Sequence, residues 1–323
     1  GNLQIGNMMA FLEYAMQVII SFLLLSMVFI MVPRAAVSVK RVGEVLDTLP
    51  SIVDPPSPQR LPDDATGKIE FKDVTFTYPD ADLPVLSSIN FTAEPGQTTA
   101  FIGSTGSGKS TLINLIPRFY DVSAGQILLD GVDIRQLKLE DLYDQIGYVP
   151  QKGVLFSGTI SSNIKYGNAK ADDKLVEKSA RIAQAAEFIS ELKNGYKNDI
   201  AQGGSNVSGG QRQRLSIARA IAVEPNVYIF DDSFSALDFK TDAKLRSALA
   251  KETKHKTVLI VGQRINTIMN ADKIIVLDEG KIVGQGTHQE LMKDCQVYQE
   301  IAASQLSEDD LQKMSVTTAK GAA

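Results

Sequence analysis

A glycine-rich segment carries the clearest chemical signal in the sequence. Residues 103–110 read GSTGSGKS, the P-loop pattern of glycine, four residues, glycine, lysine and a hydroxyl residue. An apolar stretch precedes it and a helical pattern follows it, so loop N–H groups and a helix N-terminus can close around phosphate. We expect Lys109 to reach the β- and γ-phosphates of ATP and Ser110 to hold Mg²⁺. The expected nucleotide contacts are Gly103, Ser104, Thr105, Gly106, Ser107, Gly108, Lys109, Ser110 and Thr111.

Two carboxylates form the second chemical signal. Residues 227–232 read VYIFDD, an apolar strand that ends in Asp231 and Asp232. Alone, such a strand is better explained as buried structure that ends in a helix N-cap. Because a P-loop is also present, we expect Asp231 to hold Mg²⁺ through a water molecule or through the Ser110 hydroxyl.

Charge, cysteine and histidine content exclude several other classes of protein. The 38 acidic and 33 basic residues give a formal net charge of −5, which argues against a broad basic surface for nucleic acid. Cys295 is the single cysteine, which excludes an internal disulfide and a four-cysteine zinc site. His255 and His288 are the only histidines and lie far apart in the sequence, which disfavours a histidine-rich metal centre.

The elements that must position these residues follow Lys68. Apolar strands alternate there with helical patterns: TTAFI ends at the P-loop, IGYVP at Gln151, NVYIF at Asp231 and TVLIVG at Gln263. This alternation predicts a parallel, helix-covered sheet that binds ligands at the carboxyl ends of its strands. The last two strands, KIIVLDEGKIV, are predicted to form a hairpin that turns at residues 278–280.

An apolar run near the N-terminus predicts a membrane helix. Residues 11–32 carry a single charge, Glu13. As a helix they would span roughly 33 Å, close to the hydrocarbon thickness of a bilayer. A buried helix of a soluble protein is the alternative. Arg34, Lys40 and Arg41 follow the run, so the positive-inside rule places the rest of the chain in the cytoplasm.

Prolines separate this helix from the strand-rich part. Apolar residues keep helical spacing up to Pro50, and the proline-studded stretch that follows predicts an interdomain linker. Because the chain begins with Gly1 and holds one span, we interpret it as the C-terminal part of a longer membrane protein. The expected organisation is a membrane helix with a cytosolic extension at 1–49, a linker at 50–66, a nucleotide-binding domain at 67–306 and a disordered tail at 307–323.

A further motif resembles that of one protein family. Residues 207–211 read VSGGQ and are followed by RQRLSIARA, which resembles the signature of ATP-binding cassette (ABC) exporters, with Val207 where leucine is usual. The resemblance extends from the membrane helix to about Leu306. It implies an α/β P-loop NTPase fold with a mixed-sheet core, an antiparallel β subdomain and a helical subdomain, preceded by one long transmembrane helix.

The signature also implies a dimer. A helix start with small residues offers a second anion cradle, and one chain cannot easily use two cradles on one triphosphate. In the family two domains face head to tail, so each signature meets the P-loop of the other subunit. The residues that the resemblance assigns to this contact are Ser208, Gly209, Gly210 and Gln211.

The resemblance assigns other residues one at a time. Tyr78 would stack on adenine, and Gln151 would contact Mg²⁺ or the attacking water. Residues 235–238, SALD, match the loop that touches the opposite subunit's site. The segment IAQGGSN before the signature resembles one branch of heterodimeric exporters.

Two positions depart from the family pattern. Asp232 stands where the family has a glutamate that acts as general base, and a misplacement of about 1 Å can lower a rate on the order of 10²-fold. Gln263 stands where a histidine contacts the γ-phosphate, and the loss of one preorganised donor costs about 10²–10³-fold in rate. With Asp232, Gln263 and Gln151 as its catalytic group, we expect this site to be degenerate and to hydrolyse ATP weakly.

The predicted function is that of the ATP-binding subunit of an ABC exporter in the plasma membrane. The combination of Asp232 and Gln263 resembles the degenerate-site subunit of a heterodimeric multidrug-type exporter. The partner half-transporter of such an exporter carries the usual glutamate and histidine. ATP and Mg²⁺ are the expected cofactors, with membrane lipid and an exported small molecule or peptide as partners and no nucleic acid. The alternatives are a membrane-anchored ATP sensor that transports nothing, and a soluble ABC ATPase of ribosomes or DNA, which the apolar run disfavours.

Overall fold

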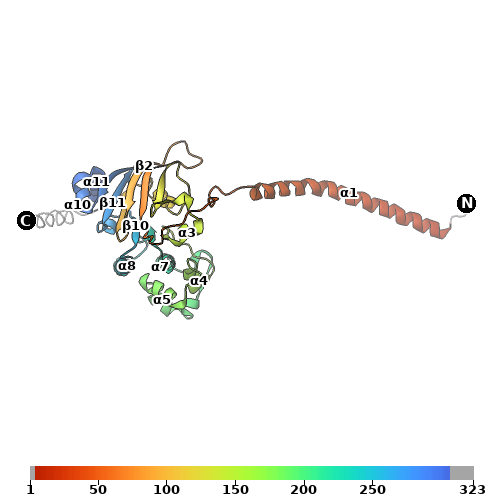
Figure 1. Cartoon of the computed structure of the whole chain (residues 1–323). Coiled ribbons are helices and arrows are strands. Elements are labelled where there is room, and N and C mark those ends of the chain that lie inside the picture. The colour runs from red at the N-terminus through yellow and green to blue at the C-terminus, as the bar shows by residue number, and fades with distance from the viewer. Residues whose placement is uncertain (1–3, 306–323) are drawn as a thin grey trace, which may run out of the picture. The chain divides into compact units, whose positions relative to one another are not determined.

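One long helix forms the N-terminal unit of the structure. The computed structural model describes residues 4–305, so the tail predicted at 307–323 lies outside the described residues. Helix α1 (Ile5–Leu46) runs for 42 residues through Pro33, and none of its residues is buried (Figure 1). It is long and apolar enough to cross a membrane. The helix ends at Leu46, before the predicted stop at Pro50.

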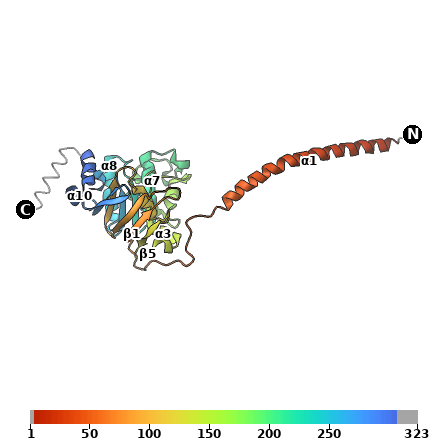
Figure 2. The same cartoon turned by 90° about the horizontal axis from the view of Figure 1, so that it is seen from above.

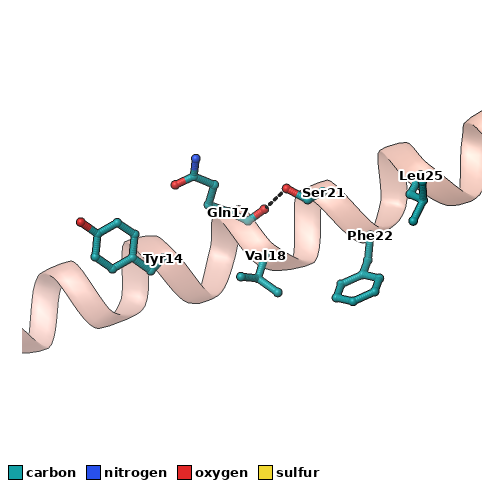
Figure 3. A pocket seen from close by; sticks show the side chains of 6 residues that line it. All are labelled: Tyr14, Gln17, Val18, Ser21, Phe22 and Leu25. Atoms are coloured by element: carbon teal, nitrogen blue, oxygen red, sulfur yellow. Dashed lines mark hydrogen bonds between the residues drawn. The ribbon is translucent and has the colours of Figure 1, made fainter.

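One face of α1 mixes polar and apolar side chains. Figure 3 shows Gln17 and Ser21 beside the apolar Val18, Phe22 and Leu25. The Ser21 hydroxyl donates a hydrogen bond to the Gln17 carbonyl at 2.8 Å. The backbone of the helix therefore satisfies a hydroxyl that would otherwise be costly to place in apolar surroundings.

An antiparallel sheet begins the second unit, which starts at Asp54. Buried and more exposed residues largely alternate along its two longest strands, as a sheet with one covered face requires. The sheet confirms the strand-rich start predicted after Lys68. In the order β2-β1-β4-β5, its strands are β1 (Ile69–Phe76), β2 (Leu86–Ala93), β4 (Ala124–Leu129) and β5 (Val132–Asp133).

The main sheet has six strands in the order β12-β11-β3-β10-β9-β6. All neighbours from β11 to β6 are parallel, and only β12 is antiparallel, to β11. This confirms the mixed sheet and the C-terminal hairpin. The strands are β3 (Thr98–Gly103), β6 (Ile146–Val149), β9 (Val227–Asp231), β10 (Thr257–Val261), β11 (Lys273–Asp278) and β12 (Lys281–Gly286).

The buried strands β9 and β10 separate two hydrophobic cores. Every residue of both strands is buried, which explains why they read as continuous apolar runs. Phe230 and Ile260 point into a core shared with the helices, whereas Ile229 and Leu259 point into a core shared with the antiparallel sheet and α2 (Lys109–Leu115). The main sheet is therefore covered on both faces.

The helices α4, α5 and α7 gather together beside the main sheet (Figures 1 and 2). They form most of the helical subdomain that the resemblance implied. The remaining helices are shorter or lie toward the C-terminus. The helices after α2 are α3 (Leu139–Asp144), α4 (Ile160–Lys165), α5 (Asp173–Ile182), α6 (Ala186–Glu191), α7 (Gly209–Ala222), α8 (Phe239–Glu252), α9 (Ile265–Ile268), α10 (His288–Asp294) and α11 (Gln296–Gln305), with the short strands β7 (Gly158–Thr159) and β8 (Asp199–Ile200) between α3 and α7.

The proline-rich segment that precedes β1 is attached to the domain at two places along its length. The Asp54 carboxylate accepts a hydrogen bond from the Leu139 N–H at 2.8 Å. The Gln59 N–H donates to the Gln136 carbonyl at 2.8 Å. From residue 54 onward the segment is therefore bound to the surface of the domain.

The carboxylate of Asp130 accepts most of the hydrogen bonds that the N–H groups at the end of this segment donate. Asp130 accepts hydrogen bonds from the N–H groups of Thr66, Gly67 and Lys68, the shortest being 2.9 Å from Gly67 and 3.0 Å from Lys68. The Thr66 hydroxyl adds a further bond at 3.2 Å. The Thr257 hydroxyl also donates to the Gly67 carbonyl at 2.7 Å, so Asp130 and Thr257 together hold the backbone where it enters β1.

Candidate nucleotide-binding site

The carboxyl ends of four parallel strands meet at one pocket. The loop after β3 supplies the P-loop, while Gln151 follows β6, Asp232 follows β9 and Gln263 follows β10. Parallel pairing brings these ends to the same edge of the sheet, where ligands of such folds bind. The cavity measures about 570 Å³ and is lined by Val85, Gly103, Ser104, Thr105, Gly106, Gly108, Lys109, Ser110, Thr111, Gln151, Asp231, Asp232, Val261, Gln263, Ile301, Ser304 and Gln305.

Two glycines of the P-loop have different structural reasons to be glycine. A Cβ atom at Gly103 would lie 2.0 Å from the Leu277 carbonyl oxygen, so the close approach of β11 excludes any side chain there. Gly106 has a φ of +86°, and a Cβ atom at this position would meet nothing within 4 Å. The loop is thus tightly packed at its start and open at Gly106, as a backbone cradle for phosphate requires.

Lys109 is held across the P-loop. Its ammonium group donates to the Gly103 carbonyl at 2.9 Å, the Ser104 carbonyl at 2.6 Å and the buried Ser107 hydroxyl at 3.3 Å. Burial lowers the pKa of Lys109, and the nearby Asp231 and Asp232 carboxylates oppose that shift. Ser107 does not line the cavity itself but helps to hold the lysine that does.

Ser110 and Asp231 lie together at the start of α2 and the end of β9. The Ser110 Oγ is 3.4 Å from an Asp231 carboxylate oxygen, and Asp231 is 6% exposed. Burial raises the pKa of Asp231, and the neighbouring Asp232 raises it further. A cation at this position would reverse both effects. With Gln151, the pair supplies the hard oxygen ligands that Mg²⁺ prefers, so the residues fit a magnesium ion.

Asp232 contacts Gln263, the other position predicted to depart from the family pattern. One of its carboxylate oxygens, Oδ2, accepts a hydrogen bond from the Gln263 side chain at 2.8 Å and another from the Gln151 side chain at 3.3 Å. Burial raises the pKa of Asp232, while the bond from Gln151 acts in the opposite direction. Residues that are 31 and 81 positions apart from Asp232 in the sequence therefore share one carboxylate oxygen.

Tyr78 lies next to the P-loop helix rather than in the lining of the cavity. Its hydroxyl is 3.0 Å from the Thr111 Oγ1, and its ring packs edge-on against Phe76 and Tyr120 at centroid distances of 4.8 and 5.3 Å. Tyr120 belongs to none of the motifs in the sequence. The sequence has nine tyrosines, and nothing in it indicates that Tyr120 is the one beside Tyr78.

The signature residues form a helix start away from this cavity. Ser208 caps α7 by accepting the Gln211 N–H at 3.2 Å, and the Gln211 side chain accepts the Ser208 N–H at 2.9 Å. None of the residues 208–211 lines the P-loop cavity. Within one chain the two candidate anion sites therefore do not converge on the same ligand.

The C-terminal helix α11 also contributes to the cavity, which no motif in the sequence predicts. Ile301, Ser304 and Gln305 of α11 line the cavity beside Gln263. They carry no motif, and Gln305 is 42 residues from Gln263, so no local spacing could have indicated the contact.

Comparison with known proteins agrees with this architecture. Residues 86–235 match the ABC transporter family. An uncharacterized ABC transporter ATP-binding protein of Mycobacterium tuberculosis is 47% identical over 309 residues, covering 94% of this chain and 53% of the relative. An ATP-dependent lipid A-core flippase of Syntrophus aciditrophicus is 43% identical over 84% of this chain and 44% of the flippase. The chain thus spans about half the length of these curated relatives.

A solved structure extends the comparison to three dimensions. A bacterial Atm1-family ABC exporter with ATP bound superposes with a TM-score of 0.84 and 33% identity, covering 95% of this chain and 54% of the exporter. One relative is a flippase, the solved structure is an exporter, and α1 is long and apolar enough to cross a membrane, so the domain after α1 is assigned to the cytoplasm. The chain belongs to the ABC transporter family, as a nucleotide-binding domain of the exporter type preceded by one long apolar helix.

Proposed function

We propose that this chain is the ATP-binding half of an ABC exporter whose own P-loop site hydrolyses ATP weakly, and that it works with a different half-transporter. The observation that carries the proposal is the environment of Asp232. Both Gln263 and Gln151 donate amide hydrogen bonds to the same carboxylate oxygen of Asp232. These two donors occupy Oδ2, so Oδ1 is the oxygen that would have to take a proton from water.

Two properties of Asp232 have opposite effects on its ability to act as a general base, namely its basicity and the length of its side chain. The raised pKa makes its carboxylate a stronger base than an ordinary aspartate. A general base must nevertheless come within about 2.6–3.2 Å of the proton that it takes, and aspartate is one methylene shorter than glutamate. Gln263 can donate a hydrogen bond but cannot accept and return a proton as histidine does. We infer that reach and proton transfer limit this site more than basicity does.

The signature supports the need for a second subunit. Residues 208–211 begin a helix of 14 residues, α7, and none of them lines the P-loop cavity of the same chain. A helix start with free N–H groups is an anion site. In the proposed pair, this signature completes the hydrolytic site on the partner, and the partner's signature completes the weak site.

The residues that would hold ATP and Mg²⁺ line the cavity, except for Tyr78, which lies beside the P-loop helix. Lys109 and the loop N–H groups would hold the phosphates, Tyr78 would lie beside adenine, and Ser110, Asp231 and Gln151 would hold the ion. Bound Mg²⁺ would neutralise charge on the phosphates. The chain's own residues keep the reacting end of ATP in place between Lys109, Gln151 and Gln263.

Export is the activity that this ATP site would drive. The named relative moves lipid A-core, and we propose for this chain the broader class of an exported small molecule, lipid or peptide. Closure of the two nucleotide-binding domains on ATP would be transmitted to the membrane helices.

The experiment compares ATP turnover by this chain alone with turnover by the assembled pair. Slow hydrolysis is expected for the chain alone in detergent despite clear ATP binding, and a rate at least about tenfold higher with the partner half. Rapid ATP hydrolysis by this chain alone would contradict the weak-site proposal. ATP binding and turnover by the pair without transport in vesicles would favour the regulatory sensor instead.

A pair of variants in this chain separates its two roles. Ser208→Ala should lower turnover by the pair about tenfold, because it disturbs the signature that serves the partner's site. Asp232→Asn should leave turnover by the pair within about twofold, because that site contributes little hydrolysis. Equal losses in both variants would contradict the division of roles. Thermal unfolding of each variant serves as the control for folding.

A further inference from the structure

The C-terminal helix closes one side of the nucleotide cavity. Tyr298 and Ala302 are fully buried and fix α11 to the core. Ile301, Ser304 and Gln305 of the same helix line the cavity together with Gln263. The position of α11 is therefore set by packing, while its last turn faces the site.

Gln305 forms two hydrogen bonds to the loop that carries Gln263. Its Nε2 donates to the Gln263 carbonyl at 2.8 Å, and its Oε1 accepts the Ile265 N–H at 2.9 Å. One amide side chain thus bridges the backbone on both sides of Arg264. This pairing uses both the donor and the acceptor of the glutamine amide.

The bridge replaces a missing helix cap. Ile265 is the first residue of α9, and Arg264 before it makes no side-chain cap hydrogen bond. The first N–H groups of a helix have no partner within the helix. Ile265 is 1% exposed, so water has poor access to this part of the loop, and Gln305 supplies the acceptor from 40 residues away.

The bridge restricts the position of Gln263, because the other end of the loop is already fixed. The Gly262 N–H donates to the Phe101 carbonyl in β3 at 3.0 Å. With Gln305 on the far side, the backbone of Gln263 is held from both directions, and its side chain reaches Asp232 at 2.8 Å. The contacts therefore run from α11 through the Gln263 backbone to the reacting end of the cavity.

We propose that Gln305 is a positioning residue for Gln263 and that it sets how strongly this site prefers ATP over ADP. The inference rests on the proposed function in one respect, namely that Gln263 contacts the γ-phosphate. ADP has no γ-phosphate, so displacement of Gln263 weakens binding of the triphosphate selectively. A general structural role for Gln305 would weaken both nucleotides together.

The experiment is a double-mutant cycle on the full chain in detergent, with Mg·AMP-PNP and Mg·ADP as the two probes. Gln305→Leu removes both hydrogen bonds with little change in volume. It should weaken AMP-PNP binding about three- to tenfold and leave ADP binding within about twofold. In a Gln263→Ala background, Gln305→Leu should have no further effect on either probe.

The matched control lies on the same helix. Gln299 also donates to backbone carbonyls, of Met292 at 3.0 Å and Lys293 at 3.2 Å, but it does not line the cavity. Gln299→Leu should leave the ratio of AMP-PNP to ADP affinity unchanged. If Gln305→Leu does not fold, Gln305→Glu replaces it, because glutamate keeps the acceptor for Ile265 but loses the donor to Gln263.

Three results would overturn the proposal. These are an equal loss of both nucleotides in Gln305→Leu, an undiminished effect of that change in the Gln263→Ala background, or no effect of Gln263→Ala on nucleotide preference. The first two assign Gln305 a structural role, and the third removes the γ-phosphate contact. AMP-PNP is not hydrolysed, so its affinity does not depend on the rate of ATP hydrolysis. Fast ATP turnover by the chain alone would therefore contradict the proposed weak site but would leave the test of Gln305 intact.

Discussion

Asp232 and Gln263, which are predicted from the sequence to depart from the family pattern, contact each other. Gln263 donates to Asp232 at 2.8 Å, so a change at either residue alters the surroundings of the other. Asp232 also has a φ of +46°, a conformation that aspartate tolerates better than most residues. We therefore expect changes at Asp232 and Gln263 to be coupled rather than independent.

The prediction at this scale is that restoring both residues increases hydrolysis. In the assembled pair, Asp232→Glu combined with Gln263→His should raise turnover at this chain's site at least about tenfold, because it restores the reach of the base and a titratable group. Each single variant should give less than half of the combined gain on a logarithmic scale, since the residues are in contact. Turnover is measured with the partner's own site inactivated.

The control for this prediction is Lys109→Ala in the double variant, which removes the ammonium from the phosphate cradle and should abolish the gain. If neither the single changes nor the double change alters turnover, the two positions do not limit hydrolysis at this site.

At the scale of elements, the segment before β1 is not a free tether along its second half. Asp54 and Gln59 bind the domain near α3, and Asp130 binds the last residues before β1. A segment bound in this way can transmit force between a membrane helix and a domain more directly than a flexible chain of the same length. The carboxylate of Asp130 provides the densest of these attachments.

We expect Asp130→Ala to release this attachment. The change leaves the N–H groups of Gly67 and Lys68 without their acceptor and should lower the free energy of unfolding by about 1–3 kcal/mol. Hydrogen exchange at residues 66–68 should become faster, which reports the local effect directly. Thermal unfolding of the chain in detergent gives the global effect.

Asp130→Asn is the matched control, because asparagine keeps an acceptor oxygen and also tolerates the φ of +47° at this position. It should retain most of the protection at residues 66–68. Wild-type exchange rates in Asp130→Ala would show that the segment is held by its other contacts.

At the scale of the whole molecule, the chain divides into a long apolar helix and a domain with its own cores. Within the described residues, those up to Val53 form one unit and those from Asp54 onward form the other. No residue of α1 is buried, whereas both hydrophobic cores are built from residues between Ile69 and Ala302. The buried apolar residues that stabilise the domain therefore all belong to the domain itself.

Removal of residues 1–53 should leave a domain that folds without detergent. Its thermal unfolding midpoint should lie within a few degrees of the full chain's, and Mg·ADP affinity within about twofold, because the cavity is lined entirely by residues after Asp54. The full chain in detergent is the reference. An unfolded or aggregated product would show that the domain depends on the membrane helix for stability.

The sequence alone determined the local features of this protein. The P-loop, the strand that ends in Asp231 and the apolar run at residues 11–32 depend on residues close together in the chain, and their physical signals are equally local. The structure bears out the strands, the C-terminal hairpin and the mixed sheet. The N-terminal helix extends farther than the apolar run, from Ile5 to Leu46.

Only the tertiary structure decided how these pieces meet. The order β3-β10-β9-β6 places β10 beside β9 and thereby brings Gln263 to Asp232. That order is set by packing of two cores against a sheet, and no local pattern encodes it. Gln305 is the clearest example, because the burial of Tyr298 and Ala302 in the core places the end of α11 at the cavity.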